Sequence, residues 1–202
     1  MLTLLIAMFV FSLTMSISPG PVNMVIVSSG ANHGFRRTLP FVSGATIGFT
    51  LLLIFVGFSF LQFVNSYPKV MLYLGLIGSA FIIYVGYKIA SSSPEITLQK
   101  SNAPTFSQGF LLQWLNPKAW IACASGAALF SDPTTHATLI AFIVIYFLVC
   151  YASLAIWAVL GERVSVILNS HLRMRLFNVV MGGMLIASAC YLVYMQLMRP
   201  VG

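Results

Sequence analysis

The amino-acid sequence predicts an all-α membrane protein whose six transmembrane helices form two inverted three-helix repeats, with helices one and four broken. Three observations support this prediction. Ten basic and three acidic residues are the only charged ones among 202. They divide the chain into long uncharged runs, and two of these runs contain proline breaks at matching places.

The composition excludes an ordinary soluble domain. Such a domain is about 25% charged, whereas this chain is 6% charged and 59% hydrophobic. Its polar surface is too small to cover a globule in water, so its exterior is expected to face the hydrocarbon of a lipid bilayer. The net charge of +7 is spread over the ends of apolar runs, which indicates contact with a membrane surface and no nucleic-acid partner.

The uncharged runs give the positions of the helices, because a transmembrane helix needs about 20 apolar residues. Continuous apolar runs favour helices over barrel strands, in which apolar and polar residues alternate. The polar stretch 91–105 is expected to be a flexible linker within a single transmembrane domain, between repeat one (residues 1–90) and repeat two (residues 106–202). We expect helices over residues 3–28, 39–63, 69–89, 106–130, 137–160 and 177–198.

The first predicted helix is interrupted near its middle by Ser18-Pro19-Gly20-Pro21. Proline has no backbone N–H and its ring crowds the carbonyl four residues earlier, so the motif should free the carbonyls of Met15 and Ile17. Hydrocarbon cannot satisfy these oxygens, and an unsatisfied backbone group there costs several kcal/mol. The freed carbonyls are therefore expected to face protein, water or a ligand.

The second predicted helix contains Gly44 and Gly48, four residues apart. Small residues at this spacing let another helix approach closely in a membrane. The approaching helix could belong to the same chain or to a second copy in a homodimer. The turn 65–68 then leads to the third predicted helix.

The fourth predicted helix is interrupted by Asn116-Pro117-Lys118, and Pro117 should free the carbonyl of Gln113. Lys118 lies deep inside this span, where an isolated lysine costs at least ~2.5–3.5 kcal/mol. Its partner could be a ligand carboxylate, a freed carbonyl or water. Alternatively, Lys118 reaches the membrane surface or only caps the broken helix.

Two matched breaks, each opening a group of three helices, are the pattern of an internal repeat. Because three is odd, the second group enters the membrane from the opposite side, and the fifth and sixth helices complete the inverted repeat. The amides of Asn23, Gln113 and Asn116 can hydrogen-bond a small polar solute, or they can join neighbouring helices. Prolines can also kink membrane helices for packing alone.

The basic residues predict the orientation of the chain. Cytoplasmic loops carry an excess of lysine and arginine, and here the alternate loops carry seven and two. Both termini are then expected outside the cytoplasm. The first set is Arg36, Arg37, Lys88, Lys100, Arg163, Arg173 and Arg175, and the second is Lys69 and Arg199.

The spans carry no pattern for catalysis or for a metal. There is no HExxH motif, no phosphate-binding glycine loop and no serine near an embedded acid and histidine. Cys123, Cys150 and Cys190 lie in apolar stretches without paired spacing, so we expect them to be buried apolar residues. The sequence therefore predicts no enzyme, no metal and no cofactor.

The motifs together resemble the LysE/RhtB family of bacterial amino-acid exporters over essentially the whole chain. The resemblance lies in residues 18–23, 33–37, Gly44 with 48–49, and 106–109 leading to 116–119. Within the family, residues 28–36 are most similar to the branch that exports cysteine and O-acetylserine. The resemblance implies a proton-driven exporter in the bacterial inner membrane, with six helices or with five helices and a re-entrant segment. By our charge count, both termini lie in the periplasm.

Taken with the two broken helices, the resemblance implies a secondary transporter that exports small neutral amino acids or their derivatives by alternating access. The carboxylate of the substrate would meet the half-helix N-termini and Lys118, and its ammonium group would meet the freed carbonyls. A channel, a lipid-handling protein and a structural membrane protein are the alternatives. The expected substrate site comprises Pro19, Gly20, Pro21, Asn23, Gln113, Asn116, Pro117 and Lys118.

Overall fold

The computed structural model describes the whole chain except residues 61–67, 92–101, 132–135, 168–169 and 199–202, and every regular element in the described part is helical. This confirms the all-α class. The elements are α1 (Leu2–Ile17), α2 (Pro21–His33), α3 (Phe35–Phe55), the π-helix η1 (Val56–Phe60), α5 (Pro68–Ala90), α6 (Phe106–Leu115), α7 (Pro117–Phe130), α8 (Ala137–Ile167) and α9 (His171–Leu197).

The helices follow the predicted spans, with four differences of four residues or more. α2 continues to His33 instead of ending at residue 28, and α3 begins at Phe35 instead of residue 39. α8 continues to Ile167 instead of ending at residue 160, and α9 begins at His171 instead of residue 177. Charged residues end an apolar run, but they are good helix formers, so these helices continue beyond the apolar segment. Most of the predicted linker 91–105 and of the turn 65–68 lies outside the described residues.

Three described helical segments are each long and apolar enough to cross a membrane: Phe35–Phe58, Ala137–Val164 and His171–Tyr191. The pair α1 and α2, bent by 59°, could form a fourth crossing. In α5 the described apolar stretch is only Leu76–Ala90, and α6 and α7 have 10 and 14 residues. The structure therefore supports a multi-pass α-helical membrane protein, while the number six stays a prediction.

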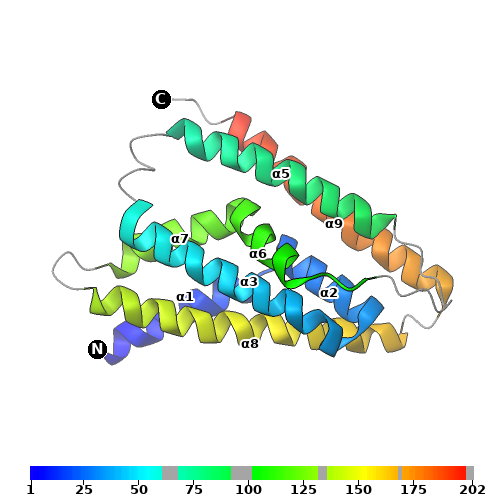
Figure 1. Ribbon diagram of the computed structural model, residues 1–202, viewed down its shortest axis with the longest axis horizontal. Coiled ribbons are helices and arrows are strands. Elements are labelled where there is room, and N and C mark those ends of the chain that lie inside the picture. Colours follow the sequence, from blue (N-terminus) through cyan, green and yellow to red (C-terminus); the bar gives the residue numbers. More distant parts are fainter. Residues whose placement is uncertain (61–67, 92–101, 132–135, 168–169, 199–202) are drawn as a thin grey trace.

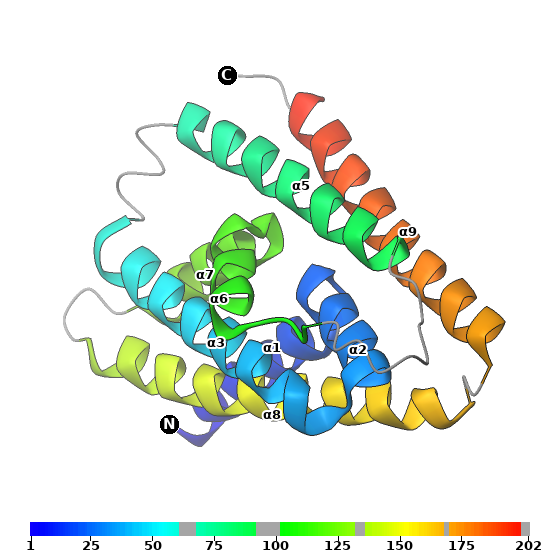
Figure 2. The same ribbon diagram turned by 45° about the vertical axis from the view of Figure 1, so that its right-hand side comes forward.

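The helices enclose α2, which is buried from Pro21 through Ala31. α8 and α3 pack against it, and α5 and α9 lie along each other on one side of the molecule (Figures 1 and 2). The end of α2, the start of α3, the ends of α5 and α8 and the start of α9 gather toward the right of Figure 1. Seven basic residues were assigned to the cytoplasmic loops from the sequence, and six of them lie at these helix ends. The seventh, Lys100, lies outside the described residues.

Glycines set the closest helix contacts. A Cβ atom on Gly44 would clash with the carbonyl of Phe106, and one on Gly48 would lie 2.9 Å from the carbonyl oxygen of Phe110. Gly109 of α6 meets the backbone of Phe41 in the same way. The close approach at Gly44 and Gly48 is thus made by α6 of the same chain.

The three cysteines differ in their surroundings. Cys123 and Cys150 are buried, as expected, but Cys190 is exposed, so the expectation for Cys190 is wrong. An apolar run shows that a helix is in the membrane but does not show which of its faces turns outward, and Cys190 lies on an outer face of α9.

Candidate functional site

The first helix break lies between Ile17, the end of α1, and Pro21, the start of α2. Its carbonyls have partners nearby. The Ser18 hydroxyl donates to the Met15 carbonyl at 3.1 Å, and the Asn23 side-chain amide donates to the Ser16 carbonyl at 2.9 Å. The break predicted from the two prolines therefore occurs, and local hydrogen bonds hold part of the exposed backbone of α1.

The second break is a single residue, Asn116, between α6 and α7. Its side-chain oxygen accepts a hydrogen bond from the Lys118 N–H at 3.1 Å, and its carbonyl accepts one from the Ala119 N–H at 2.9 Å. The Asn116 N–H donates to the Gln113 carbonyl at 3.3 Å. Asn116 thus acts as the N-cap of α7, and the Gln113 carbonyl has a partner within the chain.

Lys118 connects the two breaks. Its Nζ atom donates to the Ser18 carbonyl at 2.8 Å, to the Ser18 hydroxyl at 2.7 Å and to the Pro19 carbonyl at 3.3 Å. A cation is stabilised at a helix C-terminus, where unpaired carbonyls concentrate negative charge. In this structure Lys118 therefore contacts freed carbonyls and caps the broken end of α1, across one hundred residues of sequence.

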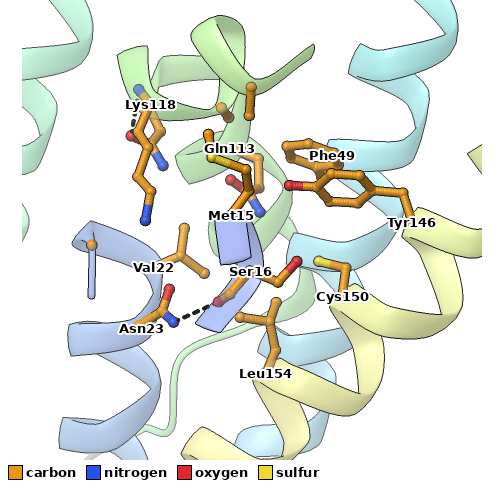
Figure 3. Close-up of a pocket in the computed structure, with 14 residues that line it drawn as sticks. Met15, Ser16, Val22, Asn23, Phe49, Gln113, Lys118, Tyr146, Cys150 and Leu154 are labelled. Atoms are coloured by element: carbon orange, nitrogen blue, oxygen red, sulfur yellow. Dashed lines mark hydrogen bonds between the residues drawn. The ribbon is translucent and has the colours of Figure 1, made fainter. Parts of the chain in front are cut away.

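A cavity lies beside this connection (Figure 3). Its atom-free space is about 380 Å³, part of which is continuous with the exterior. The volume in which the centre of a water molecule fits is about 30 Å³. One water needs about 10–15 Å³ by this measure, so the cavity has room for very few small groups. Its lining comprises Met15, Ser16, Gly20, Val22, Asn23, Phe49, Gln113, Asn116, Lys118, Ala119, Ala122, Tyr146, Cys150 and Leu154.

Five of the eight expected site residues line this cavity: Gly20, Asn23, Gln113, Asn116 and Lys118. The other three, Pro19, Pro21 and Pro117, are not among its lining residues. The prolines instead shape the backbone: Pro21 and Pro117 each occupy the first turn of the helix that follows a break.

The sequence did not indicate that α8 contributes a wall of the cavity, with Tyr146, Cys150 and Leu154, or that Phe49 of α3 also lines it. No local signal marks these residues, because they lie within continuous apolar runs. Ser16 was also missed, although a hydroxyl residue just before the Pro-Gly-Pro motif could have suggested it.

The cavity has a positively polarised end. Among the described residues, none accepts a hydrogen bond from the backbone N–H groups of Val22 and Asn23 in the first turn of α2. Lys118 Nζ lies close to Gly20, the N-cap of α2: a Cβ built on that glycine would be 3.1 Å from it. Free first-turn amides and a nearby ammonium group together favour an anionic group such as a carboxylate.

Neutral amides stand beside this end. The side chains of Asn23 and Gln113 are 6% and 5% exposed, and both line the cavity. Each amide oxygen can accept a hydrogen bond from an ammonium group. Within the described part of the chain, no group of three His, Cys, Asp or Glu residues could hold a metal ion. The cavity thus offers hydrogen-bonding groups to an anionic group at one end and to a cationic group beside it.

Comparison with known proteins gives a consistent result. The family model of the LysE type translocator matches residues 13–196. The proteins named cysteine/O-acetylserine efflux protein from Escherichia coli (strain K12) and Shigella sonnei (strain Ss046) are 31% identical over 136 residues, which cover 67% of this chain and 69% of each relative. No solved structure matches the chain.

Proposed function

The chain belongs to the LysE type translocator family, and from this premise we propose that it exports small neutral amino acids by alternating access. It is a multi-pass protein of the inner membrane and a transporter, not an enzyme. The observation that carries the proposal is the meeting of two broken helices at one polar cavity, where Lys118 contacts Ser18. Discontinuous helices near the midplane are where many secondary transporters bind their substrates.

The substrate carboxylate is placed at the N-terminus of α2, between the Val22 and Asn23 N–H groups and Lys118. The corresponding end of α7 is less suited to it, because Asn116 already accepts hydrogen bonds from the first N–H groups there. To reach the carboxylate, Lys118 would exchange at least one of its contacts at Ser18 and Pro19 for the substrate.

The substrate ammonium group is placed against the amide oxygens of Asn23 and Gln113. This revises the expectation that it meets backbone carbonyls, since the Met15 and Gln113 carbonyls accept hydrogen bonds within the chain. No Asp or Glu occurs among the described residues that line the cavity. A second positive charge on the substrate would lack a counter-charge, so neutral amino acids are favoured over dibasic ones.

Alternating access would use an inverted repeat in which α1 and α2 correspond to α6 and α7, α3 to α8, and α5 to α9. The helix contacts support this correspondence: α1 packs on α8, as α6 packs on α3. Of the other large contacts, α3 with α8 and α5 with α9 join corresponding helices, whereas the packing of α2 on α8 has only a weak counterpart in that of α7 on α3. We place the basic end in the cytoplasm and both termini in the periplasm, with protons as the coupling ion.

The name of the relatives suggests the substrates to test first, namely cysteine, O-acetylserine and amino acids of similar size. The purified protein, reconstituted in liposomes, should show saturable counterflow of such neutral amino acids and none of lysine. Conductance without counterflow would indicate a channel instead. Pro117→Ala and Lys118→Met should both lose counterflow; wild-type rates in both variants would overturn the proposed site.

A further inference from the structure

Ser16 presents an unsatisfied hydroxyl to the cavity. The residue is 6% exposed, and its Oγ atom is buried without a hydrogen-bond partner. Its carbonyl is held by the Asn23 amide at 2.9 Å, so the end of α1 is fixed while the hydroxyl is left open. A buried hydroxyl without a partner costs free energy. A group that enters the cavity could supply the missing partner.

Tyr146 and Cys150 face Ser16 from α8, one helical turn apart (Figure 3). Both are 3% exposed, and both line the cavity together with Ser16. The Tyr146 ring is clamped: it stacks on Phe49 with centroids 4.3 Å apart and meets Phe142 edge-on at 5.6 Å. The hydroxyl of Tyr146 is therefore held at a fixed place on the cavity wall.

These three residues differ in character from the rest of the lining. Lys118, the first turn of α2 and the two amides form the end of the cavity suited to a zwitterion. Ser16, Tyr146 and Cys150 offer weak, uncharged hydrogen-bonding groups, and Leu154 adds an apolar surface beside them. An amino acid whose charged groups occupy the first end would direct its side chain toward this second wall.

We propose that Ser16, Tyr146 and Cys150 form the side-chain subsite and select amino acids whose short side chain carries one hydroxyl, thiol or similarly small polar group. The subsite rests on the proposed function, because it needs an amino acid in the cavity. The space open to water centres is about 30 Å³, and Phe49 and Leu154 bound it. Long or branched side chains would overlap these residues, while a purely apolar short side chain would leave the Ser16 hydroxyl unpaired.

The test compares counterflow of serine with that of 2-aminobutyrate, which has nearly the same shape but a methyl group in place of the hydroxyl. The wild-type protein should prefer serine. Ser16→Ala and Tyr146→Phe each remove one hydroxyl and keep the packing, so each should lower this preference about three- to tenfold, the usual effect of one hydrogen bond. The readout is the ratio of the two counterflow rates within each variant, because a change common to both substrates does not alter that ratio.

Ser12→Ala is the matched control. Ser12 lies one turn earlier on the same helix and is fully buried, but its hydroxyl donates to the Met8 carbonyl at 2.7 Å and does not line the cavity. The serine preference of this variant should equal that of the wild type.

The outcomes separate the two proposals. If the wild-type protein shows no counterflow of any amino acid, the proposed function fails and the subsite fails with it. If the wild type transports amino acids but does not distinguish serine from 2-aminobutyrate, only the subsite is overturned. The same conclusion follows if Ser16→Ala and Tyr146→Phe keep the full preference, or if Ser12→Ala loses as much of it.

Discussion

The link between the two helix breaks is tested most directly by Lys118→Met, which keeps most of the side-chain length and removes the ammonium group. Nζ of Lys118 donates to the carbonyl and hydroxyl oxygens of Ser18 at 2.8 and 2.7 Å. A hydrogen bond from a charged donor contributes about 1.5–3 kcal/mol. Burying the lysine offsets part of this gain, so we expect the variant to lose about 2 kcal/mol of unfolding free energy.

For a chain of about 200 residues, this loss corresponds to a decrease in Tm of roughly 4–8 °C. Thermal unfolding in detergent, followed by tryptophan fluorescence, measures it. Lys88→Met is the control, because Lys88 is exposed in the last turn of α5, and its Tm should stay near the wild-type value. The same two variants should differ in counterflow, with only Lys118→Met losing it.

A double-mutant cycle isolates the contact itself. Ser18→Ala removes the hydroxyl that accepts from Lys118, so the effects of Ser18→Ala and Lys118→Met on the unfolding free energy should not add. Strictly additive effects, or equal Tm values for Lys118→Met and Lys88→Met, would refute the reasoning that Lys118 stabilises the broken end of α1.

Three further predictions concern packing, cavity size and orientation. Gly44→Ala should lower Tm strongly, because the new Cβ would clash with the Phe106 carbonyl. Gly183→Ala is the control: a Cβ there would meet no atom within 4 Å, so Tm should stay unchanged or rise slightly. Equal effects of the two variants on Tm would contradict the close α3–α6 contact. Leu154→Ala should cost about 2–5 kcal/mol of unfolding free energy. It should also allow counterflow of larger neutral amino acids. An unchanged substrate range would argue against Leu154 as a limit on substrate size. A reporter fused to the C-terminus should be active in the periplasm, and a cytoplasmic location would mean that the number of spans is odd or the orientation reversed.

The two helix breaks could be predicted from the sequence because they depend on local covalent chemistry. Proline lacks a backbone donor wherever it stands, so Pro21 and Pro117 mark the starts of α2 and α7 without knowledge of their neighbours. The membrane class followed from composition for a similar reason, since the balance of polar and apolar side chains determines which solvent the exterior can face. The cavity residues nearest the breaks, such as Asn23 and Asn116, were predicted for their position beside those prolines.

The partners of these residues depended on the packing of distant helices. The sequence left several partners open for Lys118, and only the approach of α7 to the end of α1 brought it to Ser18 and Pro19. The carbonyls expected to be open at Met15 and Gln113 are occupied by nearby donors, whose geometry a proline pattern does not specify.

The wall formed by Tyr146 and Cys150 likewise depends on helix packing and could not be predicted from the sequence. In a membrane helix that is apolar on all sides, periodicity does not distinguish the face toward lipid from the face toward a cavity. Contacts between helices determine which face is turned inward. At Gly44, for example, the absence of a side chain lets the backbone of α6 approach α3 closely. The sequence by itself therefore determined the solvent of this protein and the places where its helices break, and the tertiary structure decided which side chains meet in the space between them.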